Sequence, residues 1–134
     1  MTNYNFADLL VRINVAYKAK LVSVKVLKNK LTFRFLYLLY KIGLIKSFYV
    51  LPNDLQILVY LKYKKNRMPL IHSIDLISKP GKRVYWTLSF LSKNYRKHAM
   101  STFYIISTSK GLITSNEALL YKNISGEILC KIQI

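Results

Sequence analysis

Residues 102–118 read TFYIISTSKGLITSNEA, and this stretch contains a strand, a polar loop and the start of a helix in succession. The apolar run Thr102–Ile106 is typical of a strand because β-branched and aromatic residues fit a pleated, half-buried surface. Thr114 and Glu117 stand three residues apart just before an apolar pair, which is the spacing of a capping box. Between these elements, the loop Ser107–Gly111 carries hydroxyl groups and a lysine. The stretch therefore predicts a mixed α and β fold with a polar loop between its elements.

The rest of the second half has the pattern of extended chain. Apolar and aromatic residues alternate with polar ones, and turn residues separate the runs. The tetrad Lys79–Lys82 has Pro and Gly at its centre, which suits a type II turn. We expect a mostly antiparallel β half, with one helix of about two turns from Thr114. Its further strands are expected at 70–77, 84–90 and 128–132.

The first half has a different pattern, which predicts the order α-β-α-β-β. Apolar residues from Phe6 to Ile13 recur at helical spacing and predict a helix over about 5–17. Asn29 is placed to cap a second helix, and Gly43 is placed to end it. The outer face of this second helix carries Lys30, Arg34, Tyr37 and Lys41. Strands are expected at 21–26, 44–50 and 55–63.

A polar, basic segment separates the two patterns. Lys64–Pro69 reads KKNRMP, and its composition favours a linker. The fold class predicted is therefore α+β with two small domains, a first at 1–66 and a second, β-rich one at 67–134.

The composition favours a polyanionic partner. The 134 residues include 22 Lys and Arg but only five Asp and Glu, which leaves a formal charge of +17. Because 52% of the residues are hydrophobic, the chain has the material for a folded core. Too few carboxylates are present to neutralise the cations, so the partner is expected to be nucleic acid or an anionic membrane surface.

Catalytic and cofactor sites are not expected in this chain. Cys130 is the single cysteine, which excludes a disulfide within the chain and a cysteine-based zinc cluster. His72 and Asp75 are three apart in an expected strand, so their side chains point to opposite faces and do not form a dyad. The longest run without a charged residue, 98–109, is too short to span a bilayer. We therefore expect neither an enzyme nor a metal or cofactor.

Two polar segments are candidates for contact with RNA. The loop Ser107–Gly111 can donate hydrogen bonds to phosphates and ribose hydroxyls, but the same hydroxyls also suit the capping of its own turn. The turn Lys79–Lys82 groups cations just before Tyr85, whose ring can stack on a base, although a solvated turn has the same composition. The sequence alone leaves both interpretations open.

Taken in order, these segments resemble the family of small-subunit ribosomal protein eight, of the bacterial and organellar type. The segment 77–85, ISKPGKRVY, is similar to one family motif, and 106–114, ISTSKGLIT, followed by Glu117 and Ala118, to another. The segment 126–130, GEILC, is similar to the family's ending, although Ser125 replaces the first glycine of that motif. In the first half, the family's positions are matched by Asp8, Arg12, Ile13, Lys30, Leu31 and Gly43.

The resemblance implies a two-domain, non-catalytic protein that binds a looped stem in the central domain of small-subunit ribosomal RNA and supports subunit assembly and translation. It implies further that the partners are this RNA and neighbouring small-subunit proteins. Departures from the family pattern, with the biased composition, suggest a mitochondrial ribosome, and a plastid-type organelle is the alternative location. The implied RNA contacts are Tyr85, Ser107, Thr108, Ser109, Lys110, Gly126 and Glu127 in the second domain and Lys28, Asn29 and Lys30 in the first.

An alternative function is that of a peripheral protein held on an anionic membrane surface by its positive charge. That function favours cations along one face of an apolar helix. In this sequence the cations are spread over turns and strand ends, which favours RNA.

Overall fold

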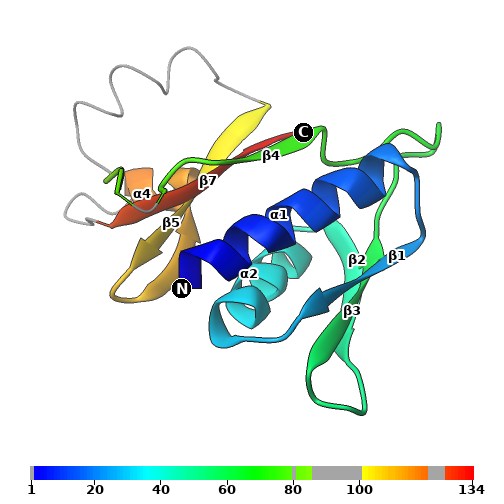
Figure 1. The fold of residues 1–134 in the computed structure, drawn as a ribbon. Coiled ribbons are helices and arrows are strands. Elements are labelled where there is room, and N and C mark those ends of the chain that lie inside the picture. Colours follow the sequence, from blue (N-terminus) through cyan, green and yellow to red (C-terminus); the bar gives the residue numbers. More distant parts are fainter. Residues whose placement is uncertain (1, 80, 86–100, 121–125) are drawn as a thin grey trace. The chain divides into compact units, whose positions relative to one another are not determined.

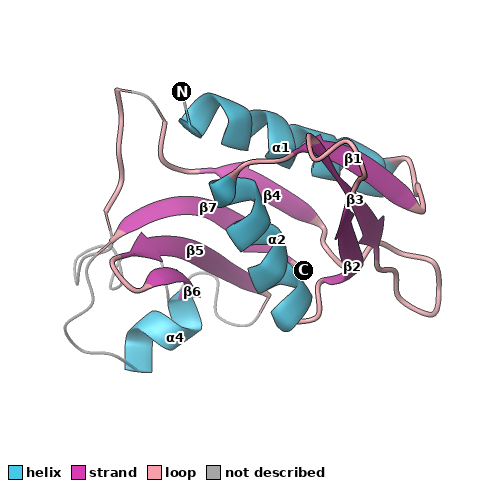
Figure 2. Cartoon of the chain, turned by 90° about the horizontal axis from the view of Figure 1, so that it is seen from below, coloured by secondary structure: helices cyan, strands magenta, loops and turns pink. Residues whose placement is uncertain are grey.

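The computed structural model describes residues 2–79, 81–85, 101–120 and 126–134 (Figures 1 and 2). The chain divides into two compact units, Met1–His72 and Ser73–Ile134. Helices and antiparallel sheets occur together in these units, so the α+β class is confirmed. Pro80 and most of the strand expected at 84–90 lie outside the described residues.

The first unit has the predicted order α-β-α-β-β. Its three strands form an antiparallel sheet in the order β1-β3-β2, with α1 packed against β1 and α2 against β2. Phe6 and Phe35 meet edge to face in its core, with ring centroids 5.1 Å apart. The elements are α1 Thr2–Lys18, β1 Ser23–Leu27, α2 Lys30–Lys41, β2 Ile45–Val50 and β3 Gln56–Leu61.

Helix α2 begins and ends where its sequence requires. The Asn29 backbone is extended, and its side-chain oxygen accepts a hydrogen bond from the Thr32 N–H at 2.8 Å, which is an N-cap. Gly43 follows the last turn with φ +86°, a left-handed conformation that costs least at glycine. One face of α2, which includes Phe35 and Leu39, is buried. Its other face remains exposed.

The segment Lys64–Pro69 forms a closed turn. Tyr63 and Pro69 pair as an antiparallel bridge, and the Lys64 N–H donates to the Met68 carbonyl oxygen at 2.9 Å. Arg67 occupies the left-handed region with φ +67°. The compact units divide three residues beyond this turn, between His72 and Ser73. The domain limit at 66/67 stays a prediction.

The second unit is an antiparallel sheet in the order β4-β7-β5-β6, with α4 packed against β5 and β6 (Figure 2). The strand β6 was not predicted, because its segment offers only two apolar residues after a glycine. The N-cap role of Thr114 in the predicted capping box is confirmed, since the Glu117 N–H donates to Thr114 Oγ1 at 3.3 Å. The elements are β4 Ser73–Leu76, β5 Thr102–Thr108, β6 Gly111–Thr114, α4 Ser115–Leu120 and β7 Glu127–Gln133.

Candidate nucleic-acid interface

Three motifs that are far apart in the sequence meet in one row across the sheet of the second unit. Tyr85 forms a bridge with Glu127, and Glu127 pairs in turn with Ser107. Residues directly opposite each other in antiparallel strands project their side chains to the same face. The side chains of Tyr85, Glu127 and Ser107 therefore lie side by side. We call these three residues the polar row.

Gly126 allows the strands under the polar row to approach closely. A Cβ atom at this position would lie 2.3 Å from the Ser107 carbonyl oxygen and 3.0 Å from methyl carbons of Ile106 and Thr108. A carbonyl fixed in a β-sheet cannot yield that space, so only a residue without a side chain fits. Gly126 thus has a structural role that the sequence did not indicate.

The segment predicted as a polar loop is a tight hairpin between β5 and β6. Thr108 Oγ1 donates to the Gly111 carbonyl oxygen at 2.9 Å and accepts from the Lys110 N–H at 3.2 Å. Thr108 therefore serves the turn, as the capping alternative proposed. Ser109 and Lys110 are exposed at the tip of the hairpin, where they can reach a ligand.

Glu127 is held in place by Arg83, a residue that was not among the predicted RNA contacts. Arg83 Nη1 lies 2.9 Å from Glu127 Oε1, and the carboxylate side chain is 24% exposed. The ion pair neutralises the one acidic group of the polar row, so the row does not repel an anion. Arg83 lies within the basic motif before Tyr85, and its charge was the available signal.

The basic turn beside the polar row has the geometry expected for it. Lys79 and Lys82 exchange two backbone hydrogen bonds, of 2.9 and 3.0 Å, and Gly81 has the φ of +82° that a type II turn requires. The buried Ser78 hydroxyl accepts from the Val84 N–H at 3.0 Å. This bond fixes the backbone just before Tyr85, a residue that is 59% exposed.

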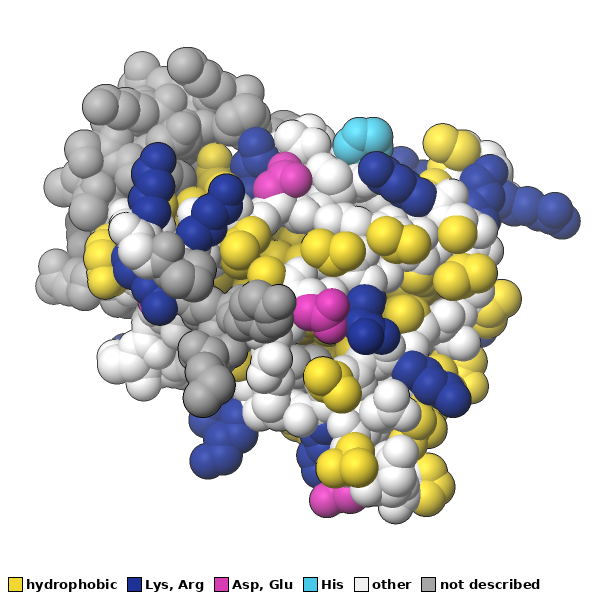
Figure 3. All heavy atoms as spheres, viewed as in Figure 1, with side chains coloured by type: hydrophobic (Ala, Val, Ile, Leu, Met, Phe, Trp, Pro, Cys, Tyr) yellow, Lys and Arg dark blue, Asp and Glu magenta, His cyan; other side chains and the backbone are white. Residues whose placement is uncertain are grey.

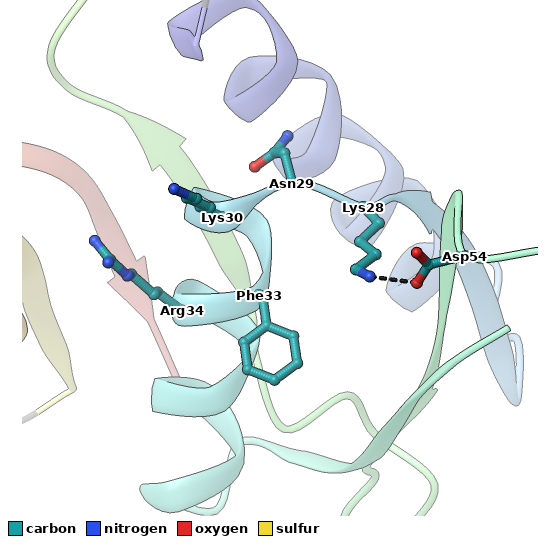
Figure 4. Close-up of a pocket in the computed structure, with 6 residues that line it drawn as sticks. All are labelled: Lys28, Asn29, Lys30, Phe33, Arg34 and Asp54. Atoms are coloured by element: carbon teal, nitrogen blue, oxygen red, sulfur yellow. Dashed lines mark hydrogen bonds and ion pairs between the residues drawn. The ribbon is translucent and has the colours of Figure 1, made fainter.

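The other predicted cluster lies in the first unit, at the beginning of α2. Lys28, Asn29 and Lys30 line a hollow of about 430 Å³ together with Phe33, Arg34 and Asp54 (Figure 4). Asn29 is committed to the cap described above, and Lys28 forms an ion pair with Asp54. Lys30 and Arg34 extend to the same side of α2 (Figure 4). This cluster belongs to the first unit, whereas the polar row belongs to the second.

The single cysteine of the chain, Cys130, is buried. Burial raises the pKa of the Cys130 thiol, which disfavours a thiolate nucleophile. Among the residues that the structure describes, no group of three His, Cys, Asp and Glu side chains is arranged to hold a metal ion. Lysine and arginine side chains are instead spread over the face seen in Figure 3, where few carboxylates lie between them.

No helix in the described ranges has the length and apolar character that crossing a bilayer requires.

Comparison with known proteins adds independent findings. The family model described as Ribosomal protein S8 matches residues 5–133. The chain is 39% identical over 130 residues to the small ribosomal subunit protein uS8 of Rickettsia bellii (strain OSU 85-389), and the match covers 96% of each chain. It is 38% identical, with the same coverage, to the protein of that name from Rickettsia canadensis (strain McKiel).

Proposed function

The chain belongs to the ribosomal protein S8 family, and from this we propose that it binds a looped stem of the small-subunit ribosomal RNA through the polar row and its neighbouring hairpin. As a member of that family it is a structural constituent of the small ribosomal subunit and not an enzyme, and its partners are ribosomal RNA and ribosomal proteins. The finer claims concern which residues bind the RNA, which RNA element they bind, and how binding supports assembly and translation.

The observation that carries the proposal is the convergence of Tyr85, Glu127 and Ser107 in one row. A phenol, a carboxylate and a hydroxyl offer an aromatic face, acceptors and donors on one face of the sheet, with each paired neighbour about 5 Å from the next. Irregular stems contain unpaired bases whose faces and Watson–Crick edges are accessible, whereas a regular helix keeps them stacked and paired, and such groups bind side chains of these kinds. The polar row therefore fits a looped stem better than a uniform duplex.

The cations around the polar row supply affinity. Lys110 at the hairpin tip and Lys79 and Lys82 at the basic turn are exposed and can neutralise phosphates. Phosphate contacts orient the RNA but carry no sequence information, whereas Glu127 can accept a hydrogen bond from the amino group of cytosine or guanine. We assign shape recognition to the polar row and electrostatic attraction to the lysines.

The first unit supplies a second contact in this proposal. Lys30 and Arg34 extend from the beginning of α2, where backbone N–H groups and the helix dipole also favour an anion. Lys28 is already neutralised by Asp54, and Asn29 caps the helix, so Lys30 is the cluster member that we expect to reach a phosphate.

We propose a mitochondrial ribosome as the location, on the basis of the biased composition and the departures from the family pattern. The curated relatives named above are bacterial. Fractionation of cells that express the tagged full chain tests this point. Enrichment with mitochondrial small subunits supports it, and enrichment with any other ribosome contradicts it.

The RNA proposal is tested with two probes of equal length, an internally looped stem from the small-subunit RNA and a fully paired duplex. Ser109→Ala and Glu127→Gln are expected to weaken binding of the looped stem more than binding of the duplex. Ser101→Ala is the control, because Ser101 is exposed just before β5 begins, whereas Ser109 follows the other end of that strand. Equal losses for the two RNAs would contradict shape recognition. Binding to anionic liposomes that survives nuclease treatment would favour the membrane alternative.

A further inference from the structure

A second surface of the first unit combines aromatic rings with cations. Tyr37 and Tyr40 on α2 and Tyr49 on β2 are each more than half exposed. With Phe33, Ser47 and Phe48 they line a groove of about 390 Å³. Phe48 fixes the groove floor, because its ring contacts that of Phe33 edge to face with centroids 5.5 Å apart and lies 6.2 Å from the ring of Tyr40. We call this surface the aromatic groove.

The aromatic groove continues into the basic hollow at the beginning of α2. Phe33 lines both, and Figure 4 shows it between Arg34 and the Lys28–Asp54 pair. Along the exposed face of α2, cations recur at Lys30, Arg34 and Lys41 and alternate with the aromatic residues. From Lys30 to Lys41 the helix rises about 16 Å. Rings and positive charges therefore share one continuous strip of surface.

The charge of this strip selects a polyanion. Among the described residues that line the hollow and the groove, Asp54 is the one carboxylate, and Lys28 neutralises it. Exposed aromatic rings interleaved with cations are the pattern of surfaces that bind single-stranded nucleic acid, where bases stack on rings and cations follow the backbone. In a paired helix the base faces are already stacked on each other, so a duplex cannot use the rings.

We propose that the aromatic groove and the adjoining cations of α2 bind an unpaired segment of ribosomal RNA, with bases stacked on Tyr37, Tyr40 and Tyr49 and phosphates on Lys30, Arg34 and Lys41. This inference rests on the proposed function only for the identity of the polyanion. The site shares no residue with the polar row, because every residue of it belongs to the first unit.

The test uses the full-length protein and a fluorescein-labelled ten-residue oligouridine, with binding followed by anisotropy. Tyr37→Leu combined with Tyr40→Leu is expected to weaken binding at least about 5-fold for each base that loses its stacking partner. Tyr37→Phe is expected to bind as the unaltered protein does, because it retains the ring. The salt slope is the slope of the logarithm of the binding constant against the logarithm of the salt concentration. Replacing Lys30, Arg34 and Lys41 by Gln is expected to reduce its magnitude by about 2, since each phosphate contact to a single strand contributes about 0.7.

A cross-comparison separates this inference from the proposed function. Tyr85→Leu is expected to weaken binding of the looped stem and to leave binding of oligouridine unchanged. The double variant of Tyr37 and Tyr40 is expected to weaken binding of oligouridine and to leave binding of the looped stem unchanged. Unchanged oligouridine binding by a double variant with unaltered thermal unfolding would overturn the aromatic groove alone. If the double variant fails to fold, Tyr37→Leu is measured alone. A photo-crosslinker at position 37 that captures only protein in native subunits would likewise overturn the inference.

Discussion

Replacing Gly126 by alanine tests the geometry under the polar row. The added Cβ would lie 2.3 Å from the Ser107 carbonyl oxygen, so β7 and β5 must separate at that point. Overpacking of this kind typically costs 1–3 kcal/mol, and we expect the upper part of that range because the obstacle is backbone rather than a side chain. A loss of about 2–3 kcal/mol lowers the Tm by roughly 6–12 °C in a protein of this size.

The assay is thermal unfolding of the full chain followed by circular dichroism, with Gly81→Ala as the control. Among the described residues other than its chain neighbours, none has a heavy atom within 4 Å of a Cβ added at Gly81, but the φ of Gly81 is +82°. Alanine there costs about 1 kcal/mol, through backbone strain alone. Gly126→Ala should therefore be the more destabilising change, and at temperatures where it is folded it should also bind the looped stem more weakly. If Gly126→Ala destabilises the protein less than Gly81→Ala does, the close approach of the two strands is refuted.

Three further predictions concern single residues. Asn29→Ala should destabilise the protein by about 1 kcal/mol in urea unfolding, through loss of the α2 cap, while Asn29→Asp should retain most of the stability; equal stability of all three proteins would show that the cap contributes nothing. Lys110→Ala should reduce the salt slope of looped-stem binding by about 1, and an unchanged slope would remove Lys110 from the phosphate contacts. Burial raises the pKa of Tyr17 to about 12 from an ordinary value of 10, so the stability from its neutral form is complete below pH 10 and is lost as the pH rises to 12. Between pH 10 and pH 12, the free energy of unfolding of Tyr17→Phe, measured with urea, should therefore fall by about 2 kcal/mol less than that of the unaltered protein. Parallel pH profiles of the two proteins would contradict this.

Local signals in the sequence predicted the elements that have strong caps and periodicity. Asn29 and Gly43 mark the ends of α2 because each satisfies a requirement of the backbone at that place. Thr114 and Glu117 likewise mark the start of α4. The strand β6 was missed because its four residues, Gly111–Thr114, offer little alternation to detect, and its existence depends on pairing with β5.

The site could be predicted only as separate motifs. Tyr85, Ser107 and Glu127 are distant in the sequence, and nothing local indicates that they share a row, since strand order and register are set by long-range pairing. The same limit applies to Gly126, whose role depends on a carbonyl that lies 19 positions earlier in the chain. The ion pair between Arg83 and Glu127 was missed for the same reason.

The exposure of the rings in the aromatic groove could not be predicted from the composition of the chain. In this sequence many tyrosines alternate with aliphatic residues, a pattern that is typical of rings packed in a sheet. Tyr37 lies on the exposed face of α2, as its helical spacing predicted. Tyr49 is exposed on β2, where its ring lies 5.8 Å from that of Tyr60. Whether a ring is buried depends on which face its helix or strand turns to the core, and that is settled by tertiary packing.

The most direct test of the central claim is a photo-crosslinker placed at Ser109, at the tip of the hairpin beside the polar row, in protein that has assembled in cells. The account predicts that irradiation links the protein to small-subunit ribosomal RNA and that nuclease releases it from the adduct. Crosslinks to protein or lipid alone would contradict the account.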